Sequence, residues 1–269
     1  VDENIAKKIT TDEFREKKYP QYFAPEIKPF ENKKWFLELD ENLNLKKSLP
    51  ENFELMRNKG ENESFICKLI REDSVEDFIV HFNKKCISPN ATINPSIYET
   101  NSFLLENQIQ SKDGIKLIEY AAFFGSIQIF TFLKNEKAEL TPSLWLYAIH
   151  SKNAELIHLL EELDIEPIIN NDNEEKSYIE CFKESIKCHH NAIANYFINN
   201  YLSNKDENSK DTFVQSLEYY NFLFLPKELV DESSFCHLCH FDYYSFVKDL
   251  SSRVDIDFSI KEIQDHIIR

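Results

Sequence analysis

The stretch "LIEYAAFFGSIQIFTFL", residues 117 to 133, decides how the rest of this chain is interpreted. Apolar residues recur at helical spacing on both sides of Gly125, and Ala121 and Ala122 stand shortly before it. Glycine readily takes the left-handed backbone that ends a helix, so the pattern predicts two helices joined by a tight turn. A turn this short places the two helices side by side as an antiparallel hairpin.

The same pairing of helix-period segments occurs four more times beyond residue 62. The starts of the second helices align at Val75, Ile127, Ala154, Ala192 and Tyr244. Their spacing is irregular because segments such as 95 to 106 and 211 to 225 are inserted. One hairpin cannot cover its own apolar face, whereas a stack can, so the chain is predicted to be all-α, an α-solenoid of about five hairpins.

The pattern divides the chain into three parts. Residues 1 to 61 contain three closely spaced prolines among six aromatic residues between Tyr19 and Phe36. Proline fixes φ and removes an amide donor, so this part is predicted to be an extended N-terminal arm with short helices, one of them starting at Thr10 or Thr11. Residues 62 to 205 hold the repeats, and residues 206 to 269 a C-terminal helical hairpin and cap. The arm either packs on its own domain or inserts into a partner.

Composition and charge narrow the class of function. The formal net charge is −16, and an acidic chain is repelled by nucleic-acid phosphates and anionic lipid, so we expect neither as a partner. The chain has only 3 glycines, which disfavours glycine-rich phosphate loops, and it lacks the common hydrolase motifs. We therefore expect no enzyme and no small-molecule substrate. Six sparse cysteines and no long apolar run predict a reduced, cytoplasmic setting.

The motif "CHLCH" (236 to 240) is the sharpest chemical pattern in the sequence. Two thiols and a following histidine at this spacing are typical of covalent haem attachment. A tetrahedral zinc site on two adjacent hairpins is a second interpretation. Its candidate ligands are Cys236, Cys239, Cys188, His189 and His190. Small apolar cysteines also suit helix packing, so we expect no cofactor and no metal. A metal- or haem-binding protein built on Cys236, Cys239 and His240 is the alternative.

Residues 121 to 133 resemble the ankyrin repeat, with two small residues, a glycine turn and an apolar second helix. The segment "TPSL" (141 to 144) resembles the threonine-proline opening of that repeat. Together with "ESIKCHHNAIANYF" (184 to 197), residues 62 to 205 resemble the divergent, trichomonad-like ankyrin-type domains of unknown function expanded in parasitic flagellate protists. The resemblance implies protein–protein interaction. The β-hairpin between ankyrin repeats is predicted to be weak or absent, because its glycines are missing.

Alignment of the hairpins places the ends of the first helices on two ladders. The first contains Arg71, Phe123, His150, Cys188 and His240, and the second contains Glu72, Phe124, Ser151, His189 and Phe241. In ankyrin-like stacks this end faces the concave side, so the ladders are predicted either to face a partner or to pack against the arm.

These observations predict a non-enzymatic scaffold or adaptor that binds other proteins, as a structural part of a larger intracellular assembly. The cytoskeleton and its microtubules are the candidate assembly. The residues predicted to bind a partner are Tyr22, Phe23, Phe30, Trp35, Arg71, Phe123, Phe124, His150, His189 and Phe241.

Overall fold

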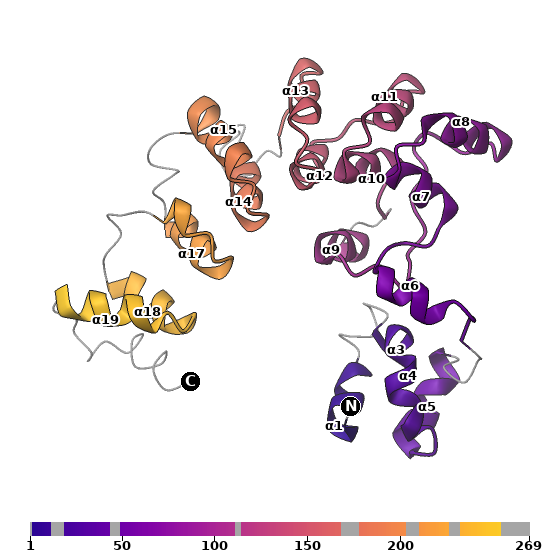
Figure 1. The fold of residues 1–269 in the computed structure, drawn as a ribbon, viewed down its shortest axis with the longest axis horizontal. Coiled ribbons are helices and arrows are strands. Elements are labelled where there is room, and N and C mark those ends of the chain that lie inside the picture. The colour runs from indigo at the N-terminus through magenta and orange to yellow at the C-terminus, as the bar shows by residue number, and fades with distance from the viewer. Residues whose placement is uncertain are drawn as a thin grey trace. The chain divides into compact units, whose positions relative to one another are not determined.

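The computed structural model describes residues 2–11, 19–43, 49–110, 114–167, 178–202, 210–225 and 232–253 (Figure 1). Every regular element in these ranges is a helix, which confirms the all-α prediction. The β-pairing within them is one isolated antiparallel bridge between Thr92 and Lys116. The chain divides into two compact units, residues 1–139 and 140–269, and the division lies inside the range predicted for the repeats.

The described part of the N-terminal segment contains the predicted short helices, but its closely spaced prolines lie in helices and not in the extended backbone that was predicted. Pro20, Pro25 and Pro29 are each the second residue of a helix, where proline lacks only an amide donor that a first turn does not use. Thr10 ends a helix instead of beginning one, and the rest of the helix predicted after it lies outside the described residues. The elements are α1 (Glu3–Ile9), α3 (Tyr19–Tyr22), α4 (Ala24–Ile27), η1 (Lys28–Phe30), α5 (Lys34–Leu43) and α6 (Phe53–Lys59).

Two of the predicted hairpins complete the first unit. The first helices of the two hairpins pack on each other, as do the second helices. Ala121 and Ala122 are fully buried, as the hypothesis of close helix approach requires. The helices are α7 (Phe65–Arg71), α8 (Val75–Lys84), α10 (Leu117–Phe124) and α11 (Ile127–Asn135), with α9 (Ser102–Gln110) in the first insertion.

The second unit contains the other three predicted hairpins and a further helical pair. That pair occupies the segment expected to be an insertion, residues 211 to 225. Its first helix packs between the hairpins before and after it. The elements are α12 (Leu144–His150), α13 (Ala154–Glu162), α14 (Ile179–Lys187), α15 (Asn191–Tyr201), α17 (Lys210–Glu218), η2 (Phe222–Phe224), α18 (Glu232–His240) and α19 (Tyr244–Arg253).

The turns inside the helical pairs share one backbone geometry. Each has a single left-handed residue with φ between 45° and 68°. These residues are Asp73, Gly125, Lys152, His189, Tyr220 and Asp242. The amide of the next residue usually returns to the carbonyl five residues earlier, as from Ser126 to Ala121 and from Asn221 to Ser216. The turn at Tyr220 therefore identifies α17 and η2 as a sixth pair, with a shortened second helix.

At four of these six turns, the residue after the left-handed position also links neighbouring pairs. Its side chain donates a hydrogen bond to a main-chain carbonyl near the end of the first helix of the preceding pair. That carbonyl belongs to the residue three positions before the left-handed residue of the preceding pair. We call this contact the inter-hairpin joint. It joins Ser126 Oγ to Ile70 O, His190 Nδ1 to Ile149 O (2.6 Å), Asn221 Nδ2 to Ile186 O (3.0 Å) and Tyr243 Oη to Leu217 O (2.6 Å).

The joint made by His190 predicts a pH dependence of stability. Burial lowers the pKa of His190 below its usual 6.5, and nearby positive charge adds to this, while the bond to Ile149 O acts in the opposite direction. The unfolded chain therefore binds a proton at a pH where the folded chain does not, so the free energy of unfolding should fall as the pH drops below about 6.5. His190→Asn keeps a donor, as Asn221 does at the equivalent position, and cannot titrate.

Denaturant midpoints measured between about pH 5 and pH 7.5 test this prediction. As the pH falls, the wild-type chain should lose more stability than the His190→Asn variant does. Parallel pH profiles for the two proteins would contradict it.

Candidate functional site

Four aromatic residues of the arm, predicted to bind a partner, contact their own chain. Phe30 and Trp35 pack against a small core of Ala6, Ile27 and Phe36. Tyr22 and Phe23 lie beside Arg57, whose guanidinium carbon is 5.3 Å and 6.0 Å from the centres of their rings. Arg57 is also paired with Glu26 through two hydrogen bonds. Within the described part of the arm, α3 and α4 are therefore tied to Arg57 of α6 by an ion pair and by contacts between its guanidinium and two rings.

Arg71 is also internal. Its Nη1 atom donates to Asn62 O and to Tyr120 Oη, both at 2.9 Å, and its Nε atom lies 3.2 Å from Glu61 Oε2. With a side chain only 14% exposed, it ties the loop before α7 to α10.

The aromatic pair that ends α10 packs against an inserted helix. Phe123 is 9% exposed and stacks on Phe103 of α9, with ring centres 5.9 Å apart. Phe124 contacts Phe123 and Tyr120 at 4.9 Å and 4.8 Å. The sequence left open whether the ladders face a partner or pack against the arm. Phe123 instead packs on α9, which lies outside the arm.

The candidate ligands of a zinc site on adjacent hairpins are not grouped together in the described residues. His189 is exposed at a left-handed turn, and His190 is engaged in the inter-hairpin joint. Cys236 and Cys239 pack in the C-terminal core, where Phe213 and Leu217 are also buried. Phe241, predicted to bind a partner, is half-buried against the same core.

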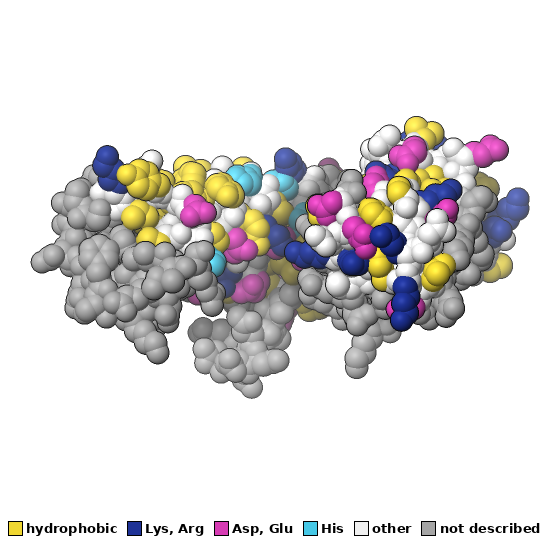
Figure 2. All heavy atoms as spheres, turned by 90° about the horizontal axis from the view of Figure 1, so that it is seen from below, with side chains coloured by type: hydrophobic (Ala, Val, Ile, Leu, Met, Phe, Trp, Pro, Cys, Tyr) yellow, Lys and Arg dark blue, Asp and Glu magenta, His cyan; other side chains and the backbone are white. Residues whose placement is uncertain are grey.

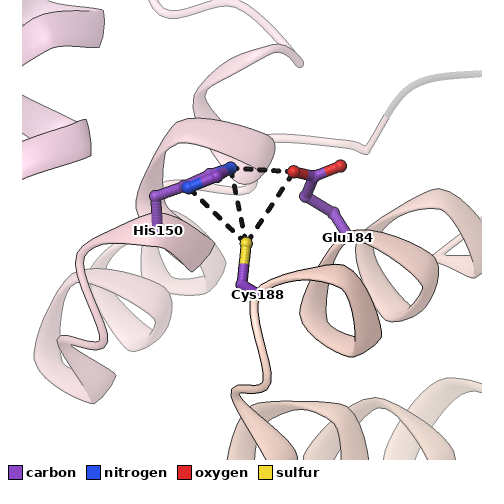
Figure 3. A group of neighbouring side chains, drawn as sticks. All are labelled: His150, Glu184 and Cys188. Atoms are coloured by element: carbon purple, nitrogen blue, oxygen red, sulfur yellow. Dashed lines mark hydrogen bonds and ion pairs between the residues drawn. The ribbon is translucent and has the colours of Figure 1, made fainter. Parts of the chain in front are cut away.

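Another group of potential ligands does converge in the described residues: His150, Glu184 and Cys188 (Figure 3). His150 is the last residue of α12, Glu184 lies on α14, and Cys188 caps α14, which packs on α12. His150 Nε2 is 2.8 Å from Glu184 Oε1, and Cys188 Sγ is 3.5 Å from both ring nitrogens and 3.8 Å from Glu184 Oε1. The ladder alignment predicted that His150 and Cys188 are equivalent. It missed Glu184, which stands one helical turn before Cys188 on the same face.

The charge state of this cluster argues against a thiol nucleophile. Burial raises the pKa of Cys188 to about 12, and the charge of Glu184 adds to the rise. Burial acts to raise the pKa of Glu184 as well, but the hydrogen bond with His150 and the charge of Lys187 outweigh it, so that pKa is lowered. A thiol with a raised pKa is a poor nucleophile, and Sγ is not aligned with one imidazole nitrogen. One nitrogen, one oxygen and one sulfur donor instead make a set of metal ligands.

The first unit contains a pocket of about 230 Å³ beside α3, a volume suited to one side chain rather than to a large cofactor. Its lining residues are Tyr19, Tyr22, Phe23, Ile97, Glu99, Thr100 and Leu105. Glu99 is only 8% exposed and accepts a 2.9 Å hydrogen bond from the amide of Asn101. Burial raises the pKa of Glu99, partly offset by backbone amides and by Arg71. Aromatic faces beside a carboxylate are the surroundings that bind an organic cation.

Sequence reasoning identified Tyr22 and Phe23 but missed Glu99, because its segment has neither helical nor strand periodicity. Figure 2 shows acidic, basic and hydrophobic side chains intermixed over the described part of one face. In the ranges that the structure describes, each helix is too short or too polar to cross a bilayer. Comparison with models of known protein families, with curated proteins and with solved structures finds no match to this chain. The ankyrin-type resemblance therefore stays a prediction.

Proposed function

We propose that this protein is a non-enzymatic scaffold, a stack of helical hairpins that holds a partner protein. The observation that carries the proposal is the inter-hairpin joint, which recurs four times with the same backbone geometry. Within each compact unit, a repeated contact between like pairs generates a stack, because the joined pairs meet their neighbours in the same way. An α-solenoid is the arrangement that such a repeat favours, and an intracellular, cytoskeletal assembly stays the candidate setting.

The pocket beside α3 is the place where we propose that the partner engages. Tyr19, Tyr22 and Phe23 supply ring faces, and Glu99 supplies the negative charge. A lysine or arginine side chain satisfies both, since its stem packs on rings while its head pairs with a carboxylate. The two nearby arginines of the chain are already engaged elsewhere, since Arg57 is paired with Glu26 and Arg71 with Glu61. The net charge of −16 favours encounter with a basic segment.

Selection of binding peptides from a random library, with the full chain as bait, tests the pocket. The enriched peptides should share a lysine or arginine whose replacement abolishes binding. Glu99→Gln should weaken binding by roughly tenfold, the loss expected when one charged contact is removed. The glutamine still accepts the hydrogen bond from Asn101, so the fold should be preserved.

Phe65→Ala is the matched control, since Phe65 is an aromatic residue 54% exposed on α7 and outside the pocket. It should leave the affinity unchanged. Peptides that bind Glu99→Gln as well as the wild-type chain would contradict the pocket assignment. Cross-linking in native cells that captures no partner of the full chain would contradict the scaffold function itself.

A further inference from the structure

We propose that His150, Glu184 and Cys188 form a zinc site, distinct from the cysteine motif at residues 236 to 240. Such a site adds a metal to the proposed scaffold. It rests on different residues from the partner pocket, so the two proposals can fail separately.

The types of ligand favour zinc. Imidazole nitrogen, carboxylate oxygen and thiolate sulfur all bind Zn²⁺, and a mixed set with a soft sulfur disfavours Mg²⁺ and Ca²⁺, which prefer oxygen. The three protein ligands leave one tetrahedral position for water or for a group from a partner protein.

The spacing of the ligand atoms also fits. Zinc bond lengths of about 2.0–2.3 Å at tetrahedral angles place neighbouring ligand atoms about 3.3–3.6 Å apart. Here the separations are 3.5 Å between nitrogen and sulfur, 3.8 Å between sulfur and oxygen, and 2.8 Å between nitrogen and oxygen. The first two need almost no movement. The third requires His150 and Glu184 to separate by about half an ångström as their hydrogen bond is replaced by two bonds to the metal. The imidazole proton then moves from Nε2 to Nδ1, so the ring stays neutral and Nε2 offers its lone pair to zinc.

The positions of the side chains make the site accessible as well as ordered. His150 and Glu184 are 13% and 14% exposed, and the three side chains point toward one another from two packed elements (Figure 3). Well-packed helix ends hold the ligands close to the required geometry, so little ordering entropy is lost when the metal binds.

Two lysines lie near the cluster and act in opposite ways. Lys187 Nζ is 3.7 Å from Glu184 Oε1 and competes with a metal for that carboxylate. The pair is long, and Lys187 is partly exposed, so a divalent cation can displace it. The charges of Lys187 and Lys152 also favour the thiolate of Cys188, the form that binds zinc.

Binding must release a proton. Burial holds Cys188 as a thiol, so the S–H proton passes to solvent as the sulfur–zinc bond forms. About one proton should leave for each zinc bound near neutral pH, and the affinity should rise with pH.

Titration of the chelator-treated full chain with Co²⁺, followed by displacement with Zn²⁺, tests the proposal. We expect a thiolate-to-cobalt absorption band that saturates near about one equivalent and disappears when zinc is added. Cys188→Ser should remove the band. Glu184→Gln, which keeps a hydrogen-bonding partner for His150, should weaken zinc binding by roughly tenfold or more.

Cys239→Ser is the matched control, because Cys239 is another partly buried cysteine of the same unit but lies outside the cluster. It should leave the band and the affinity unchanged. Circular dichroism of each metal-free variant separates lost binding from lost folding, and His150→Ala supplies a second test if Cys188→Ser does not fold. A band that survives Cys188→Ser, or zinc binding weaker than roughly 10 µM, would overturn the assignment.

Discussion

Trp145→Ala should lower the free energy of unfolding by about 3–5 kcal/mol, because it empties the largest fully buried side chain of the second unit. The Trp145 ring meets Tyr178 and Phe197 edge to face, with ring centres 5.4 Å and 6.2 Å apart. Its Nε1 atom donates a 2.7 Å hydrogen bond to the buried carbonyl of Ile165. Alanine removes both the packing and the donor, so that carbonyl is left unsatisfied.

Thermal unfolding followed by circular dichroism measures this loss. The midpoint should fall by about 10 °C for a chain of this size. Tyr244→Ala removes an aromatic ring that is 74% exposed and should change stability by less than about 0.5 kcal/mol. Equal midpoints for the two variants would mean that the contacts of Trp145 with Tyr178, Phe197 and Ile165 do not stabilise the second unit.

Arg71→Ala should cost about 2–3 kcal/mol of stability, which distinguishes the structure from the sequence-based prediction that Arg71 faces a partner. The guanidinium makes hydrogen bonds to Asn62 O and Tyr120 Oη and an ion pair with Glu61. Bonds from a charged donor are stronger than neutral ones, and their loss leaves the hydroxyl of buried Tyr120 without this donor.

Lys68→Ala provides the control for Arg71, since Lys68 lies one turn earlier on α7 and its side chain is 58% exposed. Its loss should be small, because exposed ion pairs contribute little. Urea denaturation of the two variants tests the prediction. Unchanged stability in Arg71→Ala, together with lost partner binding, would restore the partner-facing interpretation.

The helical hairpins could be predicted from sequence because apolar periodicity is a local property. The pairs of helices from α7 to α19 follow from apolar residues at helical spacing and from gaps of a few residues. The sixth pair was missed because Tyr220 holds the left-handed turn position, which bulky residues rarely occupy. The prolines were misinterpreted because the first turn of a helix and an extended segment accept proline equally well.

The candidate sites were less predictable because they depend on contacts between distant residues. The alignment of the hairpins placed His150 and Cys188 at equivalent positions, because the same position in successive repeats lies at the same place on each repeat. Glu99 lines a pocket together with residues about 80 positions away in sequence, and no local pattern encodes that. The cysteine motif at residues 236 to 240 has the local spacing of a haem site, but Cys236 and Cys239 lie in a packed core, the role that their small apolar side chains suggested.

The inter-hairpin joint has a consequence for how such proteins diverge. Its acceptor is a main-chain carbonyl, which every residue possesses, and its donor is in turn a serine, a histidine, an asparagine and a tyrosine. Selection for the contact therefore constrains the length of the side chain and its ability to donate a hydrogen bond, but it does not fix the identity of the residue. Copies produced by duplication can then lose all resemblance to one another while the backbone geometry persists. Common ancestry of the repeats in arrays of this kind should be sought by superposing the backbones of their turns. Sequence alignment compares residue identities and therefore misses the backbone geometry that the repeats share.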